Sequence, residues 1–331
     1  MANKKTARVV CEDYCKRFPD TPDLTLAKKI YKENSKLFTS VESCRSTIRT
    51  IRGHNGDYSR NNAKDKTLFK PLTHNYNPFN IPESHSVKQE VFKLPKSIKK
   101  VLVLSDIHFP YHDVEALTAA LQYGKDQKVD AIYLNGDIMD FYDVSFHEKD
   151  PRKMDVAGEL EMCRQFLSEL RKHFTCPIYF IPGNHEIRLE RYLRVKAPEL
   201  LNLQEFRLDV LLRVGENRIE YLKHGTKVYF GKLLVEHGDK MKGAGGVNPA
   251  RTLLLKFKRP TICGHFHRTS SANSKVYDDD SMMAWTSGCL CELEPGYMEL
   301  NEHNHGFIIV NVNDDDTFNV ENKMIIKGKV Y

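Results

Sequence analysis

The chain has 331 residues, of which 28% are charged and 40% hydrophobic. This length predicts about two domains, and the composition is typical of a globular protein and excludes a fibrous or wholly disordered one. No apolar run approaches the roughly 20 residues of a membrane helix, and no apolar segment follows the basic start at Met1–Lys5. We therefore expect a cytoplasmic protein with no membrane partner.

The charge is unevenly distributed along the chain. The net charge is +6, but residues 1–100 hold 21 Lys and Arg against 10 Asp and Glu, a net of +11, and the remainder is mildly acidic. The eight Cys are scattered and do not form a compact disulfide framework. A basic first third suggests a module that meets polyanions.

Three short helices are predicted at the start of the chain. Apolar residues recur at helical spacing over 7–17, a second helix begins near Pro22, and Ser40 can cap a third. Glycines end the third helix, and the whole resembles a helix-turn-helix unit. We expect a small all-α, helix-turn-helix-like domain over residues 1–56.

The third helix carries three arginines. Arg45, Arg49 and Arg52 are interleaved with Ser and Thr and lie away from the apolar stripe of that helix. Arginines and hydroxyls on an exposed helix face suit contacts to phosphates and base edges. These arginines are candidate nucleic-acid-binding residues, and an ordinary solvated face is the alternative.

The rest of the chain predicts a linker and an α/β domain. Residues 57–97 are rich in Asn and Pro and are expected to form an extended linker. Residues 98–331 alternate strands and helices. The expected strands are 101–106, 131–137, 177–184, 228–237, 260–265, 282–291 and 306–312, with a closing hairpin over 316–330. The expected helices are 113–124, 155–173 and 186–213.

Potential metal ligands follow the predicted strands. Functional sites of open α/β sheets lie at the carboxyl ends of the strands. Five clusters of Asp, Asn and His directly follow apolar runs, and each is flanked by a small residue. The clusters contain Asp106 and His108, Asp137 and Asp140, Asn184 and His185, His237, and His265 with His267.

These motifs in this order, DxH, GDxxD, GNHE, HG and GHxH, resemble those of the calcineurin-like metallophosphoesterases. The resemblance covers about residues 99–312, and the stretches 140–151 and 183–193 look further like phosphoesterases encoded by tailed bacteriophages. It implies a layered sheet sandwich flanked by helices, preceded here by the small helical domain.

The resemblance implies two divalent metal ions. One would be held by Asp106, His108 and His267, the other by Asn184, His237 and His265, with Asp137 bridging both. Mixed carboxylate, amide and imidazole ligation suits Mn²⁺, the expected ion, and also Fe, Zn²⁺ or Ni²⁺. Two such ions would supply a hydroxide that attacks phosphorus.

His185 is not needed as a ligand in this pattern. The resemblance implies that His185 protonates the leaving oxygen or stabilises the transition state, with Asp140 placed to orient it. A helix cap is the alternative role for Asp140.

The substrate is less clearly marked. Phe141 and Tyr142 follow GDIMD where the protein phosphatase branch of the family carries an Arg, which disfavours a phosphoprotein substrate. Arg188 and Arg191 follow the GNHE motif and are candidates for binding substrate phosphate. A solvated helix face is the alternative.

We expect a dinuclear phosphoester hydrolase that acts on nucleic-acid phosphodiesters, a nuclease with an N-terminal DNA- or RNA-binding module. One alternative is a phosphatase for nucleotides or other small phosphoesters. A second alternative is a DNA-binding regulator whose phosphoesterase fold is inactive. If the protein is phage-encoded, it would act in the host cytoplasm.

Overall fold

The computed structural model describes residues 4–53, 79–86, 89–146, 149–150, 152–153, 155–241, 246–275, 281–294 and 301–331. Contacts divide the chain into two compact units, Met1–His85 and Ser86–Tyr331. We describe each unit by itself. Most of the expected linker over 57–97, namely residues 57–78, lies outside the described residues.

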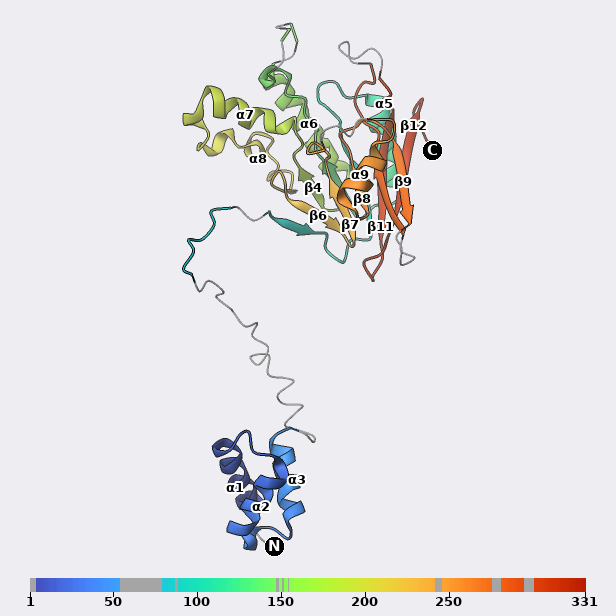
Figure 1. Cartoon of the computed structure of the whole chain (residues 1–331). Coiled ribbons are helices and arrows are strands. Elements are labelled where there is room, and N and C mark those ends of the chain that lie inside the picture. Colours follow the sequence, from blue (N-terminus) through green and yellow to red (C-terminus); the bar gives the residue numbers. More distant parts are fainter. Residues whose placement is uncertain are drawn as a thin grey trace. The chain divides into compact units, whose positions relative to one another are not determined.

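The first unit is a set of three helices, drawn in blue in Figure 1. They are α1 (Lys4–Arg17), α2 (Asp23–Glu33) and α3 (Val41–Ile51), with a 3-10 turn, η1 (Ser35–Leu37), before α3. Ser40 caps α3 by accepting a hydrogen bond from the Ser43 amide at 3.1 Å. The three predicted helices are confirmed. Their shared apolar core consists of Cys11, Leu26, Ala27, Ile30, Phe38, Cys44, Ile48 and Ile51.

The expectation that Arg52 faces outward is wrong. Its side chain is only 17% exposed and pairs with Asp23 at 2.8 Å. The same guanidinium donates to the carbonyl oxygens of Thr21 and Phe18. Arg52 therefore ties the end of α3 to the turn between α1 and α2. Arg49 is exposed, and Arg45 is half-buried beside Glu42 at 3.4 Å.

The second unit contains two sheets. The first has seven strands in the order β13-β12-β11-β2-β3-β4-β5. Strands β2, β3, β4 and β5 run parallel, and β11 joins β2 antiparallel. The bounds are β2 (Lys100–Leu104), β3 (Ala131–Asn135), β4 (Ile178–Ile181), β5 (Ile219–Tyr221), β11 (His305–Val312), β12 (Phe318–Ile326) and β13 (Lys329–Val330).

The second sheet has six strands in the order β1-β6-β7-β8-β10-β9. The bounds are β1 (Val91–Lys93), β6 (Lys227–Phe230), β7 (Leu233–Glu236), β8 (Thr261–Cys263), β9 (Ser270–Lys275) and β10 (Ser281–Thr286). Strand β1 pairs with β6, so the end of the expected linker is part of this sheet. The expected strand 228–237 is instead a hairpin, because the chain turns at Gly231, whose φ is +57°.

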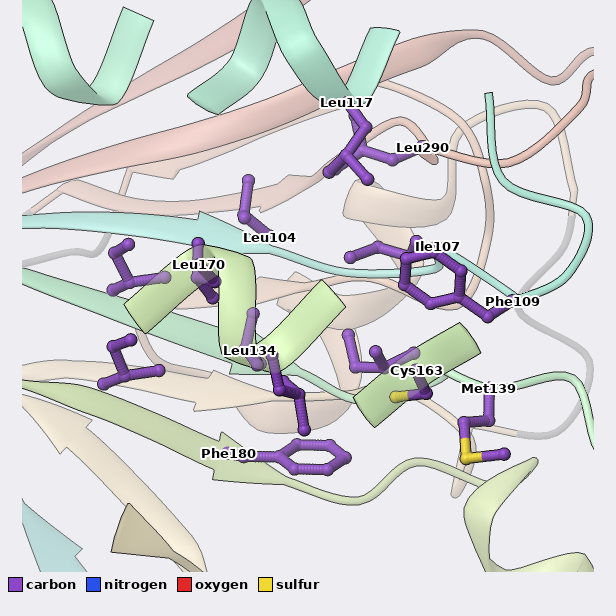
Figure 2. Close-up of a cluster of buried hydrophobic side chains, with 14 of the residues drawn as sticks. Leu104, Ile107, Phe109, Leu117, Leu134, Met139, Cys163, Leu170, Phe180 and Leu290 are labelled. Carbon is purple, nitrogen blue, oxygen red and sulfur yellow. The ribbon is translucent and has the colours of Figure 1, made fainter. Parts of the chain in front are cut away.

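Alternate residues of the first sheet face two different cores. One set meets the second sheet, where Val103 and Tyr133 pack with Phe230 and Val235. The other set meets the helices α5 (Val114–Asp126) and α6 (Val156–His173). Figure 2 shows Cys163 and Leu170 of α6 beside the strand residues Leu134 and Phe180. A further helix, α9 (Pro249–Phe257), packs on β9 and β10 of the second sheet.

The helices of this unit were predicted with mixed success. Helices α5 and α6 lie where expected. The expected helix over 186–213 is confirmed only at its start, because α7 (Glu186–Lys196) ends before Pro198. Short turns η4 (Pro198–Leu200) and η5 (Gln204–Phe206) and the short α8 (Leu208–Leu211) follow. Helix α9 and the polar strand β9 were not predicted. Among the described residues, no helix is long and apolar enough to span a bilayer.

Candidate metal centre

The predicted ligands lie in loops that leave the strands at one edge of the two sheets. Strands β2, β3 and β4 are parallel neighbours, so the loops that follow them start at the same edge. Strands β7 and β8 are also parallel, and they carry His237 and the GHFH motif at their ends. The carboxyl ends of parallel strands therefore bring together residues that are up to 161 positions apart, Asp106 and His267.

Apolar neighbours hold the ligand loops in place. Ile107 lies between Asp106 and His108 and is fully buried, and Met139 lies between Asp137 and Asp140 and is buried as well. Figure 2 shows Ile107 and Met139 within the hydrophobic core beside α6. Polar and apolar residues thus alternate, and the apolar ones anchor the polar ones at the edge of the core.

Five of the predicted ligands have left-handed backbones. Their φ values are +56° for Asp106, +54° for His108, +52° for Asp137, +66° for His265 and +51° for His267. This conformation is uncommon for residues other than glycine and costs roughly 1–3 kcal/mol each. Such strain persists where the surrounding structure enforces it, and here it aims side chains at one point.

Two glycines make room for the carboxylates. A Cβ at Gly183 would collide with Asp137, and a Cβ at Gly264 would collide with Asp106 at 2.5 Å. The His265 amide donates to Asp106 at 2.9 Å, and the His185 amide donates to Asp137 at 2.9 Å. The carboxylates are therefore fixed against the loop backbones.

The first predicted ligand group converges in space. The Nε2 atoms of His108 and His267 are 3.2 Å apart, and His267 Nε2 is 3.4 Å from Asp106 Oδ1. Asp137 Oδ2 is 4.0 Å from His108 Nε2. The side chains of Asp106, His108 and Asp137 are almost fully buried.

The second predicted group meets the first at Asp137. The same Oδ2 oxygen of Asp137 is 3.1 Å from His237 Nε2, which is 3.3 Å from Asn184 Oδ1. His237 Nδ1 lies 2.7 Å from the carbonyl oxygen of Asn135, which fixes the ring. Donor atoms of Asp137, His237 and His265 all lie within 4.8 Å of one another. Asp137 is thus placed between the two groups.

Charge within the cluster shifts several pKa values strongly. Burial alone would raise the pKa of Asp106, but the hydrogen bond and charge of His267 lower it to about 2. Burial alone would lower the pKa of His237, but Asp137 raises it to about 10. Burial alone would also raise the pKa of Asp137, but the surrounding histidines outweigh it and hold this pKa well below its usual range.

The donor set fits divalent cations. Two of the groups that could hold an ion join imidazoles with the Asp137 carboxylate, His108 with His185 and His237 with His265, and a third joins His108 and His267 with the Cys291 thiol. Borderline metals prefer such donors. His108 Nε2 and His267 Nε2 lie 3.2 Å apart, which is close enough for both nitrogens to bind one ion. The shared carboxylate of Asp137 can offer one oxygen to each ion.

His185 and Asp140 lie beside the cluster. His185 Nδ1 is 3.0 Å from Asp140 Oδ1, and the same carboxylate oxygen is 3.2 Å from His108 Nδ1. Burial lowers the pKa of His185, but the charge of Asp137 and the bond to Asp140 outweigh it, so the pKa is raised. Asp140 therefore contacts two histidines and not one.

Arg188 contacts this histidine directly. Its Nη2 lies 2.8 Å from His185 Nε2, and its Nη1 donates to the Asp140 carbonyl at 2.9 Å. A guanidinium only donates, so this contact requires Nε2 to be an acceptor. Protonation of Nε2 would displace Arg188 from this position. Arg191 is exposed one turn further along α7, and no contact joins it to the cluster among the described residues.

Sequence reasoning gave no role to Glu186, although it belongs to the GNHE motif. Its buried carboxylate accepts hydrogen bonds from the amides of Asp137, Ile138, Met139 and Gly183, at 2.7–2.9 Å. It thereby joins the loop after β3 to the loop after β4. The motif itself was the signal that pointed to this residue.

Cys291 was also left out of the predicted site. Its Sγ lies 3.8 Å from His267 Nδ1, and its position allows a metal-ligand group with His108 and His267. The only sequence signal for Cys291 was that a second cysteine, Cys289, lies two residues before it. Arg45, Arg49 and Arg52 belong to the other unit, so the structure does not relate them to this cluster.

Comparison with known proteins identifies the family. The chain is 29% identical to the Gene 54 protein of Mycobacterium phage L5 over 57% of its length and 77% of that protein. It is 28% identical to the Gene 54 protein of Mycobacterium phage D29, over 51% and 69% of the two chains.

Among solved structures, a Vps29 mutant from Entamoeba histolytica aligns at 12% identity and a TM-score of 0.38, covering 70% of this chain and 96% of the other. A dimetal phosphatase from Danio rerio aligns at 9% identity and a TM-score of 0.33, covering 68% and 96%. Residues 99–293 match the calcineurin-like phosphoesterase family, which uses divalent metal ions. The chain belongs to this family and is a metal-dependent phosphoesterase.

Proposed function

We propose that the protein is a dinuclear hydrolase of nucleic-acid phosphodiesters. Asp106, His108 and His267 would hold one ion, and Asn184, His237 and His265 the other, with Asp137 shared. When bound, the two ions, with Mn²⁺ expected and Fe, Zn²⁺ or Ni²⁺ as alternatives, supply a hydroxide nucleophile and neutralise charge on the phosphoryl oxygens. The convergence of these donor atoms supports the assignment.

The chain's own residues would handle the leaving group. His185 lies 3.8 Å from the shared oxygen of Asp137, so it is close to where the phosphoester would lie. Asp140 accepts from Nδ1, and Nε2 accepts from Arg188, so Nε2 would first take up a proton from solvent, which displaces Arg188, and would then give that proton to the leaving oxygen. The displaced Arg188 would bind a phosphoryl oxygen, since its bidentate geometry suits phosphate.

A groove beside Arg188 carries the nucleic-acid proposal. It has a volume of about 490 Å³ and lies between α7 and the segment after η3 (Tyr142–Val144). Its walls combine cations with exposed apolar and aromatic side chains: Lys149, Arg188, Arg191, Lys196, Tyr192, Val195 and Phe146. Basic grooves with aromatic side chains suit a single-stranded backbone and its bases.

The N-terminal helical unit would add affinity for the same polyanion. Arg49 is exposed on α3, and Lys28, Lys32 and Lys36 are exposed on or just after α2. Several other basic residues of this unit, such as Arg8 and Lys29, form ion pairs within their own helices. The module proposed for binding is therefore Arg49 with these lysines, with Arg45 beside them, and Arg52 acts in folding.

A second candidate function is a phosphatase for nucleotides or other small phosphoesters. The cavity of about 270 Å³ beside His108 and His267 could hold the organic group of such a substrate. An inactive, DNA-binding regulator is less well supported, because every predicted ligand retains a metal-binding side chain. Two mycobacteriophage relatives support a phage-encoded protein that acts in the host cytoplasm.

The test begins with Mn²⁺-dependent hydrolysis of bis(p-nitrophenyl) phosphate against p-nitrophenyl phosphate, followed by labelled single- and double-stranded DNA and RNA. The charge-reversed variant Arg191→Glu/Lys196→Glu should weaken single-stranded DNA binding. It should also flatten the salt dependence of that binding, by about 0.7 in slope for each phosphate that the protein no longer neutralises. Lys172→Glu/Lys232→Glu provides a matched control with exposed lysines elsewhere. Preference for the monoester, with no nucleic-acid cleavage, would favour the second candidate.

A further inference from the structure

A second cavity opens directly on the metal-ligand cluster. It has a volume of about 270 Å³, and part of its wall is formed by His108, Asp140 and His267. A phosphoester held at the cluster would therefore project one of its esterified groups into this cavity. The remaining walls come mainly from Tyr111, Tyr142, Lys153, Glu292, Glu294 and His303.

Two buried polar atoms in this wall bear on what the cavity can bind. Tyr111 Oη and His303 Nδ1 are buried, and in the described part of the chain neither has a hydrogen-bond partner. Buried polar atoms are nearly always paired, because leaving them unpaired costs their hydration. The His303 ring also packs against the His267 ring, with centroids 4.7 Å apart. Both atoms are buried within the cavity wall, so a ligand of the cluster would reach them once the two side chains turn toward the cavity.

The cavity wall is aromatic, and its charges do not favour an additional phosphate. The Lys153 ammonium lies 4.3 Å from the Tyr142 ring centroid and 5.1 Å from that of Tyr111. Glu292 and Glu294 are exposed parts of the same wall, so carboxylates outnumber this one lysine. An uncharged, flat group with polar atoms at its edge matches this lining better than a second anion does.

The size of the cavity limits what it can hold. Its volume of about 270 Å³ is near the lower end of small-molecule pockets, about 300 Å³. One nucleoside fits this range, and a base pair does not. The groove along α7 has a different lining, with four cations, and is suited to the charged backbone instead.

We propose that this cavity holds one nucleoside of an unpaired nucleic-acid substrate, with its base edge hydrogen-bonded to Tyr111 Oη and His303 Nδ1 and the scissile phosphate on the metal-ligand cluster. This inference rests on the proposed function. A base that uses its Watson–Crick edge to bind the protein cannot also pair with a complementary strand. The enzyme therefore cleaves single strands or frayed ends and leaves fully paired duplexes intact.

Calorimetric titration of the Mn²⁺-loaded full chain tests the cavity. The probes are AMP, ribose 5-phosphate and inorganic phosphate. AMP should bind about 5- to 100-fold more tightly than ribose 5-phosphate, which is the range that base contacts with aromatic side chains supply. Equal affinities for AMP and ribose 5-phosphate would show that no base occupies the cavity and would overturn the inference.

The variant Tyr111→Phe separates a binding role from a folding role. It should weaken AMP binding about 2- to 10-fold, the effect of one hydrogen bond, and leave phosphate binding unchanged. Its melting temperature should stay the same or rise, because the variant removes a buried hydroxyl that has no hydrogen-bond partner among the described residues. Tyr123→Phe on α5, outside the cavity wall, should leave AMP affinity unchanged. A lower melting temperature with unchanged AMP affinity would contradict the inference.

Turnover distinguishes this inference from the proposed function. Hydrolysis of bis(p-nitrophenyl) phosphate is measured on the same preparations, and cleavage of single-stranded DNA is compared with cleavage of blunt duplex. Turnover without any preference for AMP, or equal cleavage of single strand and duplex, overturns the nucleoside cavity alone. A preference for AMP without turnover of any phosphoester keeps the cavity and overturns the hydrolase.

Discussion

The metal-ligand cluster and helix α3 of the N-terminal unit both carry charged residues, but the two regions hold them differently. At the cluster, the carboxylates and imidazoles are buried and are fixed by neighbouring amides, as at Asp106 and Asp137. Arg45 on α3 and Arg52 directly after it form ion pairs within their own unit, and Arg49 remains exposed. Buried and converging polar side chains therefore indicate a functional site more strongly than charged side chains on a helix surface do.

The largest effect should come from the carboxylate shared by both ligand groups. Asp137→Asn should lower turnover of bis(p-nitrophenyl) phosphate by about 10³-fold or more, because a neutral amide cannot bridge two cations and metal catalysis supplies several kcal/mol. Metal content, measured by mass spectrometry, should fall with it. Asp143→Asn, on the neighbouring turn η3, is the control. Wild-type activity in Asp137→Asn would refute the ligand assignment.

The next effect separates chemistry from metal binding within the cluster. His185→Gln should retain both ions and lose about 10²- to 10⁴-fold in kcat, the usual contribution of a positioned acid or base. His173→Gln replaces an exposed histidine at the end of α6 and should change nothing. If His185→Gln instead loses metal, His185 is a ligand and the division of roles is wrong.

A third effect concerns how buried backbone amides hold the cluster together. Glu186→Gln should lower the free energy of unfolding by about 2–4 kcal/mol, because it replaces a charged acceptor of several amides with a group that also donates. Glu190→Gln, on the same helix but exposed beside Arg194, should change stability by less than about 0.5 kcal/mol. Denaturant unfolding of the full chain measures both. Similar values for the two variants would show that Glu186 does not link the loops.

The smallest effect tests the N-terminal side of the comparison. Arg52→Ala should destabilise α1–α3 by about 1–3 kcal/mol, since it removes the ion pair with Asp23 and the hydrogen bonds to two carbonyl oxygens. Hydrogen exchange followed by mass spectrometry localises this change to the unit in the whole chain. Arg49→Ala should leave exchange unchanged and weaken nucleic-acid binding with a lower salt slope. If neither variant binds nucleic acid more weakly than the wild type, α3 is not part of the proposed interface.

Sequence patterns predicted the strands and motifs of the cluster well, because each signal is local. Strand β2 is a short apolar run, and the polar residues that follow it have a fixed spacing, so their place at the strand end could be foreseen. The hairpin at Gly231 and strand β9 were missed. Strand β9 is a polar edge strand whose residues alternate in exposure beside β10, and its own sequence carries little hydrophobic signal.

The sequence by itself determined the α/β architecture of the second unit, the three N-terminal helices and the set of potential ligands, since these follow from hydrophobic periodicity and spacing. Only the tertiary structure decided which charged side chains bind other parts of the protein. Arg52 pairs with Asp23, Glu186 accepts hydrogen bonds from backbone amides such as that of Asp137, and Arg188 contacts His185. The tertiary structure also brought Tyr111 and His303 into one cavity wall. Partners of this kind lie far apart in the chain, and only packing determines which polar groups are buried together and which of them lack a partner.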